Sequence, residues 1–288
     1  MELKQNPFSF YDFLGYFTPG SLFVYFCIAV SIHSGDALFS ITELEASAGL
    51  TKADLYIPFI LVAYTIGHVL SYVSSVTVER YAIWALGYPS KYLLGIKPDG
   101  YFSMKENKIT RTVVRSLVFL ILLPITVPEI IIGRAFGLRT LYAKKLDDLL
   151  VNLIVGKLDP LLKEKGGLSN LSDYGDAKSS NFFLFAYHYC VENSQRHFPK
   201  MQNYVALYGF LRTLTLLSVI AFWTLAWQLS VHPFSLLQNL LLILVVSLSS
   251  YIFFIGFVKF YTRFCLEVLM ALAVTDMKSN KAKQSGTS

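Results

Sequence analysis

Residues 54–78 read DLYIPFILVAYTIGHVLSYVSSVTV, and this stretch decides the class of fold. It is longer than the run of about 20 apolar residues that a helix needs to cross a bilayer. Among Asp, Glu, Lys, Arg and His residues it contains only Asp54 and His68. A helix satisfies its backbone hydrogen bonds internally, so a run of this kind forms a helix in lipid. The stretch therefore predicts a membrane-spanning helix.

Three further apolar runs predict three more spans, at about 21–33, 207–231 and 234–258. The first run is short, and it reaches full length only if its helix begins near Leu14 and continues through Pro19 and Gly20. A tight turn at 232–233 separates the last two runs, and the last helix is expected to continue to about residue 276. We therefore expect an all-α integral membrane protein with about four transmembrane helices.

The composition supports this class of protein. Hydrophobic residues make up 54% of the 288 residues and charged residues only 15%, whereas soluble chains carry about 25% charge. The surplus apolar surface is concentrated in long runs, so it is expected to face lipid. The three cysteines lack a CxxC spacing, and they predict neither a disulfide framework nor a zinc site.

The distribution of Lys and Arg predicts the topology. Residues 79–112 hold six of these cations and residues 134–200 hold ten, whereas residues 35–53 hold one. Positive charge stays on the cytoplasmic side, so both basic segments are expected there. The run between them, 113–133, contains Pro124 and Pro128, and we expect it to re-enter the membrane or to lie in its plane. A single crossing, which would make five spans, is the alternative.

This topology divides the chain into four parts and predicts that both termini lie in the cytoplasm. Residues 1–78 form an interfacial segment and the first two spans. Residues 79–203 form a helical, basic cytoplasmic module that includes 113–133. Residues 204–276 form the last two spans with a cytoplasmic extension, and residues 277–288 form a disordered tail.

The second span carries a small and polar face that includes His68, Ser71 and Ser75, together with Gly67 and Ser74. Polar residues inside a membrane usually face a bundle interior or a water-filled cavity, which makes these three side chains candidates for lining a pore. Small residues also let transmembrane helices approach closely, so helix packing is the other interpretation. The two can coexist in an oligomer.

Three charged residues lie in or beside the apolar runs. Glu129 is either a functional charge at membrane depth or an interfacial residue partnered by Arg115 or Arg134. Arg212 and Lys259 are interpreted as snorkelling side chains that mark the cytoplasmic ends of the third and fourth spans.

The cytoplasmic module combines cations with aromatic residues. A helix over 138–158 has an apolar stripe, which is expected to pack on a second helix over 182–196, on the membrane surface or on a neighbouring subunit. Cations hold phosphates and rings stack on bases, so an anionic ligand is one interpretation and an anionic lipid surface is the other. The candidate ligand-binding residues are Arg139, Lys144, Lys145 and Lys157.

The sequence contains no HExxH, GxSxG, phosphate-loop or Asp-rich motif. We therefore expect no catalytic residue, no metal site and no cofactor, and the chain is not predicted to be an enzyme.

Two stretches resemble a group of small bacterial multi-span membrane proteins: FYDFLGYFTPG at 10–20 and YVALYGFLR at 204–212. Some members of that group are membrane effectors of antiphage defence, as in Hailong-type systems, and occur beside nucleotidyltransferase-like enzymes. The resemblance implies an oligomeric channel controlled by a nucleotide-derived or single-stranded DNA signal.

These observations predict a homo-oligomeric, ligand-gated effector or ion channel in the lipid bilayer. Its cytoplasmic module would sense an anionic signal, a nucleotide or single-stranded nucleic acid, or a soluble nucleotidyltransferase-like partner. One alternative is a membrane scaffold that recruits a soluble partner. Another is a lipid-active enzyme or transporter that uses His68, Glu129 or Arg212.

Overall fold

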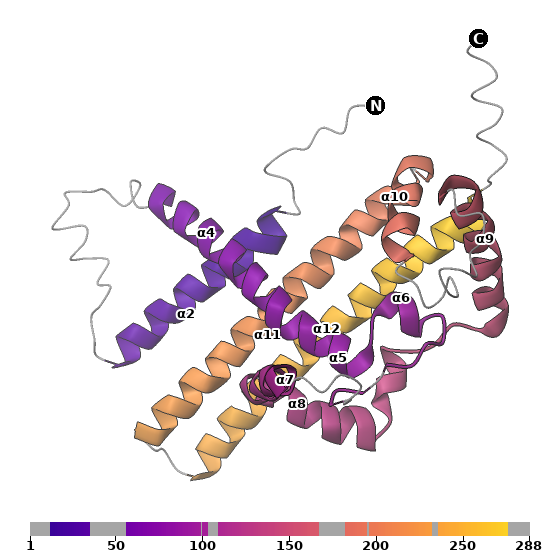
Figure 1. The fold of residues 1–288 in the computed structure, drawn as a ribbon. Coiled ribbons are helices and arrows are strands. Elements are labelled where there is room, and N and C mark those ends of the chain that lie inside the picture. The colour runs from indigo at the N-terminus through magenta and orange to yellow at the C-terminus, as the bar shows by residue number, and fades with distance from the viewer. Residues whose placement is uncertain are drawn as a thin grey trace. The chain divides into compact units, whose positions relative to one another are not determined.

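The computed structural model describes residues 12–34, 56–98, 100–102, 109–166, 182–194, 196–231 and 236–275, and every regular element in these ranges is a helix (Figure 1). Four helices are long and apolar enough to cross a membrane: Phe13–Ile32, Tyr56–Tyr92, Phe198–Val231 and Leu237–Val274. The predicted all-α fold with four spanning helices is confirmed. The expected turn at 232–233 and the expected tail at 277–288 lie outside the described residues.

The chain forms two compact units. The first contains Met1–Ile83, Tyr101–Leu138 and Ala206–Val258. The second contains Trp84–Gly100, Arg139–Val205 and Lys259–Ser288. Each is described in turn.

The first unit begins with a π-helix, η1 (Phe13–Phe17), that runs directly into α2 (Thr18–Ser34). The Thr18 hydroxyl donates a hydrogen bond of 3.0 Å to the Phe13 carbonyl, which supports the wide turn. Pro19 lies at the junction where the π-helical turn passes into the α-helix, and its missing N–H interrupts the ladder of hydrogen bonds there. The helix nevertheless passes through Pro19 and Gly20, and the first span has its full length, as the sequence required.

The second span consists of α4 (Tyr56–Ser74), the π-helix η2 (Ser75–Glu79) and α5 (Arg80–Leu86). In the first unit α2 and α4 cross (Figure 1) at two glycines. A Cβ atom on Gly20 would lie 1.8 Å from the Ala63 carbonyl oxygen, and one on Gly67 would lie 1.9 Å from the Tyr16 carbonyl oxygen. The backbones touch at these points, as small residues allow in membrane helix pairs.

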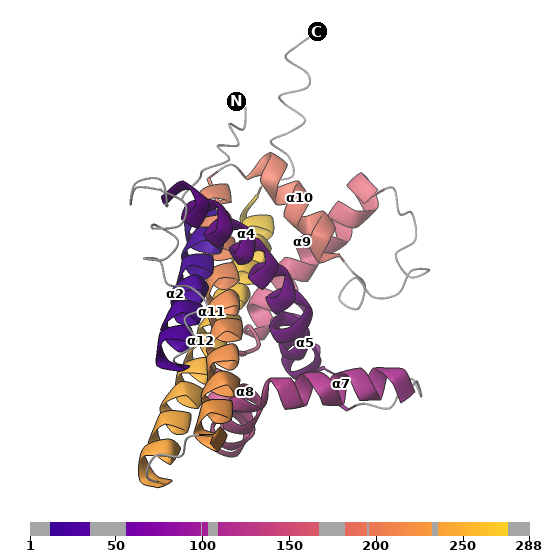
Figure 2. The same ribbon diagram turned by 90° about the vertical axis from the view of Figure 1, so that its left-hand side faces the viewer.

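The segment with two prolines forms α7 (Ile109–Ile121), α8 (Leu123–Pro128) and the π-helix η3 (Glu129–Ala135). It bends by 83° at Leu122 (Figure 2). Pro124 lies in the first turn of α8, whereas Pro128 is accommodated inside the helix. The predicted interruption therefore occurs next to the first proline only. A bend of this size is compatible with a broken crossing and with a re-entrant loop.

The last two spans are α11 (Phe198–Val231) and α12 (Leu236–Val274). In the first unit they meet closely, since a Cβ atom on Gly256 would lie 3.2 Å from a methyl group of Leu211. The Ser247 hydroxyl donates to the Pro124 carbonyl at 3.0 Å, so α12 also holds α8. The prediction that the fourth span continues as one helix past Lys259 is confirmed.

The second unit contains α6 (Pro89–Tyr92), most of the 3-10 helix η4 (Leu138–Leu141), α9 (Asp148–Gly166) and α10 (Phe183–Asn193). The predicted helix over 138–158 is wrong at both ends. The Leu146 N–H bonds the Leu93 carbonyl, and the Asp147 side chain accepts the Asp148 N–H, which starts α9 there. The helix then continues through Pro160.

The apolar stripe of α9 also differs from the predicted one. Val151, Ile154, Leu158 and Leu161 are buried, whereas Leu149 is 70% exposed and Leu153 is 44% exposed. The helix continues past residue 158 and so adds Leu161 to the stripe, whereas Leu149 and Leu153, which the apolar spacing placed on the stripe, lie on the outer face.

Helix α10 packs on the C-terminal part of α12 within the second unit. The Phe183 and Tyr187 rings lie 5.9 Å and 5.7 Å from the Phe264 ring, and the Cys190 thiol donates to the Val268 carbonyl at 3.5 Å. Burial raises the pKa of the Cys190 thiol to about 12.

This core predicts an unreactive thiol. At pH 8, about one Cys190 thiol in ten thousand should be ionised, against about one in four for an ordinary cysteine. A Cys27→Ser, Cys265→Ser chain, which keeps Cys190 alone, should resist maleimide in mild detergent and react fully in dodecyl sulfate. Equal labelling rates in the two detergents would show that α10 is not packed as described.

Candidate functional site

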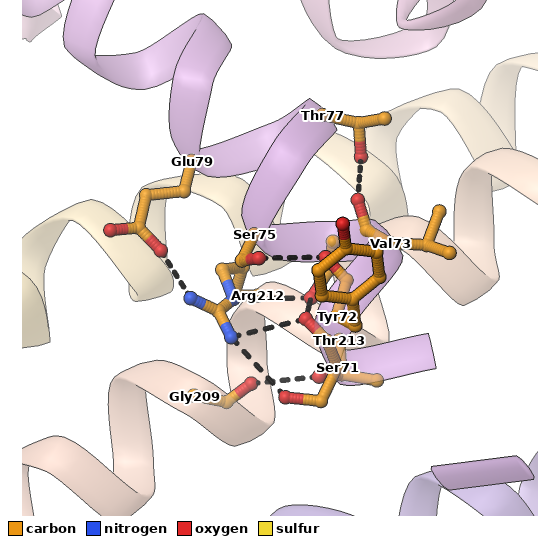
Figure 3. Close-up of polar contacts among 10 residues, drawn as sticks. Ser71, Tyr72, Val73, Ser75, Thr77, Glu79, Gly209, Arg212 and Thr213 are labelled. Atoms are coloured by element: carbon orange, nitrogen blue, oxygen red, sulfur yellow. Dashed lines mark hydrogen bonds and ion pairs between the residues drawn. The ribbon is translucent and has the colours of Figure 1, made fainter. Parts of the chain in front are cut away.

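The most polar cluster of the first unit surrounds Arg212 on α11 (Figure 3). Its guanidinium pairs with the Glu79 carboxylate at the end of η2. The Arg212 Nε donates to the Ser74 hydroxyl at 3.1 Å, and one terminal nitrogen, Nη2, donates to the Ser71 carbonyl at 3.2 Å and the Ser71 hydroxyl at 3.3 Å. One cation therefore joins α11 to the end of α4 and to η2.

The local sequence explains why this turn can accept a cation. Hydroxyls bond their own helix here: Ser74 to the Ser71 carbonyl at 2.8 Å, Ser75 to the Tyr72 carbonyl at 2.7 Å and Thr77 to the Val73 carbonyl at 2.7 Å. The helix widens into η2 directly after Ser74, so Ser75 and Thr77 lie within the π-helical turn. A π-helical turn frees carbonyl groups from the regular ladder, and such turns often occur at functional sites. The Ser71 carbonyl is the one that Arg212 uses.

The ion pair is mostly shielded from solvent. The Arg212 side chain is 12% exposed and the Glu79 side chain is 22% exposed. The head group of Arg212, interpreted from the sequence as snorkelling, is held by Glu79 and the two serines. Removing one member of a buried pair leaves an uncompensated charge, and that is strongly destabilising.

The three predicted pore-lining residues occupy different surroundings. The His68 ring is exposed and stacks on Tyr16 of η1 at 3.9 Å, with Tyr64 edge-on at 4.6 Å. Ser71 belongs to the Arg212 cluster, and Ser75 bonds its own helix. The structure thus brings Ser71 to a charged partner and leaves His68 in an aromatic group.

A second buried polar group is Glu129 on η3. It is 1% exposed, so its side chain is buried within the protein, and the interpretation as an interfacial residue stays a prediction. The Tyr251 hydroxyl donates to one carboxylate oxygen at 3.2 Å. A Cβ atom on Gly133 would lie 2.5 Å from that oxygen, which shows that the carboxylate folds back over the glycine. Arg115, one of the two predicted partners, donates to the Tyr101 carbonyl at 2.7 Å.

The predicted ligand-binding cations lie in the second unit. Arg139 donates to the Ala85 carbonyl at 3.0 Å, and Lys145 pairs with Asp148 at 2.5 Å, so two of the four have partners within the unit. Lys144 is exposed and Lys157 is half-buried on α9.

Glu79 is the functional candidate that sequence reasoning missed. It ends the apolar run of the second span and precedes Arg80, which made it look like the first residue of a polar segment. The available signal was a pair of opposite charges, Glu79 and Arg212, each adjoining an apolar run.

Comparison with family models, with curated proteins and with solved structures finds no match to this chain. The chain is a multi-span helical membrane protein by its fold, and its finer function is argued from the site.

Proposed function

We propose that this protein is a homo-oligomeric membrane effector that forms a gated pore, and that the cluster around Arg212 holds the pore closed. The observation that carries the proposal is the shielded Arg212–Glu79 pair, which ties α11 to the face of α4 that bears Ser71.

Joining two apolar helices by a charged pair costs desolvation free energy. Apolar side chains of similar volume often stabilise a buried position as well as an ion pair does, or better. Ionisable residues within membrane helices are rare and usually serve a water-filled path or a conformational change. Permanent packing alone would not need Arg212, and this supports a contact that is made in one state and released in another.

The same contact suggests how the proposed pore opens and closes. In the closed state Arg212 holds the Ser71 carbonyl and hydroxyl, so this part of the polar face is occupied. Release of Arg212 would leave Ser71 available to line a path for water and ions together with Ser75, which lies one turn further along the same helix. A signal can shift this equilibrium only if it binds one of the two states more tightly.

The exposed surface supports assembly in lipid. Large apolar side chains of α4 and α12 are exposed, among them Ile57, Leu61, Tyr72, Leu240 and Leu244. Four spans are few for a path enclosed by a single chain, so the pore is placed on the axis of a homo-oligomer.

The resemblance of 10–20 and 204–212 to membrane effectors supports a role in bacterial antiphage defence. We place both termini in the cytoplasm of the inner membrane. The signal is a nucleotide or single-stranded nucleic acid, or a nucleotidyltransferase-like partner.

Ion flux from liposomes tests the pore. The purified full chain is reconstituted with a potassium gradient, and membrane potential is followed with a dye. Glu79→Gln keeps the shape of the side chain and removes its charge, so we expect basal flux to rise several-fold. Adding Ser75→Leu should return flux to the background of protein-free liposomes, because the bulky side chain obstructs the path.

Thr65→Val is the matched control for Ser75→Leu. The Thr65 hydroxyl is exposed and bonds the Leu61 carbonyl of its own helix, outside the Arg212 cluster. In the Glu79→Gln background this change should leave the flux high. Wild-type flux in a folded, reconstituted Glu79→Gln chain would overturn this role of the cluster, and flux that survives Ser75→Leu would remove that residue from the path.

A further inference from the structure

A basic strip runs along the second unit where α11 begins and α12 continues past Lys259. The two helices are antiparallel here: His197 Nδ1 lies 2.8 Å from a Glu267 oxygen, and the Tyr204 ring lies 6.3 Å from Phe260. Residues four apart share a face of a helix. This register aligns Lys200 and Tyr204 on α11 with Lys259 and Arg263 on α12. We call Lys200, Lys259 and Arg263 the basic strip.

A carboxylate beside the strip, Glu267, is already paired. One oxygen of Glu267 lies 2.8 Å from His197 and the other lies 2.8 Å from Lys200. The Glu267 side chain is only 11% exposed, so it is held between these two partners. Glu267 therefore anchors the start of α11 and leaves Lys259 and Arg263 uncompensated.

The positive charges of the basic strip repel one another. Arg263 lies close enough to Lys200 for their positive charges to repel. Both Lys259 and Arg263 are exposed, and within the described part of the chain neither forms an ion pair. Gathered like charges raise the local potential and attract an anion, which would relieve the repulsion.

The strip stands on a rigid base. On the other side of α12, Phe264, Cys265 and Val268 are buried, and α10 packs against Phe264 and Val268. The backbone that carries Lys259 and Arg263 is thus held before any ligand binds, so little ordering is required when a ligand binds.

We propose that the basic strip binds a phosphate group, with the half-buried Tyr204 ring beside it as an apolar neighbour. Arg and Lys bind phosphate through strong charge-assisted hydrogen bonds, Arg often through two at once. The inference rests on the proposed function, in which an anionic signal binds the strip and acts on α11, the helix that carries Arg212. It replaces Arg139, Lys144, Lys145 and Lys157 as the sensing residues. The phosphate belongs either to a free nucleotide or to an anionic lipid headgroup.

The test uses the full chain in nanodiscs of two compositions, neutral phosphatidylcholine alone or a mixture with phosphatidylglycerol. One arm measures binding of ATP with a fluorescent ribose label to the neutral discs by anisotropy. The other arm measures how many phosphatidylglycerol molecules are retained when the chain is extracted from the mixed discs.

Lys259→Gln with Arg263→Gln removes two charges, and Lys97→Gln with Lys163→Gln removes two exposed charges elsewhere in the same unit as a matched control. We expect the first pair to weaken one of the two ligands by at least about tenfold, because charged hydrogen bonds are lost. The control pair should change binding less than about twofold, since its cations lie off the strip. Both chains should keep their melting temperatures, because all four side chains are exposed.

A loss confined to ATP identifies a free nucleotide, and a loss confined to phosphatidylglycerol identifies a lipid headgroup. Equal effects of the two variant pairs, or no effect of either, would overturn the strip as a phosphate site. The flux result for Glu79→Gln is independent of this outcome. A negative binding result would leave the proposed pore unaffected, and a negative flux result would leave phosphate binding to the strip still measurable.

Discussion

Gly67→Ala is expected to separate η1 from α4 and to leave little folded protein. The new Cβ atom would lie 1.9 Å from the Tyr16 carbonyl oxygen. That oxygen belongs to the backbone and cannot rotate away, as the end of a flexible side chain could. Overpacking in a core costs about 1–3 kcal/mol, and a clash with backbone belongs at or above the upper end of that range. Gly20→Ala should behave similarly, because its Cβ atom would lie 1.8 Å from the Ala63 carbonyl oxygen.

The measurement is the yield of monodisperse protein in mild detergent, followed by its melting temperature. Gly209→Ala is the matched control, since Gly209 is also helical and a Cβ atom there has no neighbour within 4 Å. Alanine is about 1 kcal/mol better than glycine inside a helix, so this control should melt at or above the wild-type temperature. If Gly67→Ala and Gly209→Ala melt alike, the two helices are not in backbone contact.

Arg212→Met is expected to cost about 3–5 kcal/mol of stability, because it leaves the Glu79 carboxylate shielded and without its cation. The side chains are only 12% and 22% exposed, so water can compensate little of the loss. The thioether chain fills much of the space of arginine but cannot donate to Ser71 or Ser74. Thermal unfolding in detergent should show the loss as a clear fall in melting temperature.

A second change separates the charge from the packing. Arg212→Met combined with Glu79→Leu removes both charges, and it should recover most of the stability that the single change loses. Arg80→Met is the matched control: Arg80 is exposed and adjoins Glu79 in sequence, so its loss should be nearly neutral. A double variant as unstable as Arg212→Met would mean that hydrogen bonds to the serines, rather than the ion pair, stabilise the cluster.

The two predictions probe different requirements of the same unit. The glycines permit the approach of α2 to α4, and the ion pair joins α4 to α11. Only the second contact is proposed to open during function. Variants of Gly20 and Gly67 should therefore lose protein, whereas Glu79→Gln keeps the shape of the side chain, leaves the Arg212 cation without its carboxylate, and should raise the permeability of the chain that remains folded.

Sequence reasoning succeeded where the cause is local. The run at 56–74 becomes a helix because its own residues are apolar and no neighbour is needed to explain it. The bend at Leu122 could be expected because Pro124 cannot continue a regular hydrogen-bond ladder. The start of α9 was misplaced, because it depends on the bond from Leu146 to Leu93, a residue far away in sequence.

The amino-acid sequence by itself determined that this protein is helical, that four helices can cross a membrane, and that polar residues interrupt the second span. Long apolar runs have few other ways to satisfy their backbone in lipid. Only the tertiary structure decided the partner of each polar group: Glu79 for Arg212, Tyr251 for Glu129 and Glu267 for Lys200. Those pairs depend on which helices pack together and in what register, and periodicity within one helix carries no information about its neighbour.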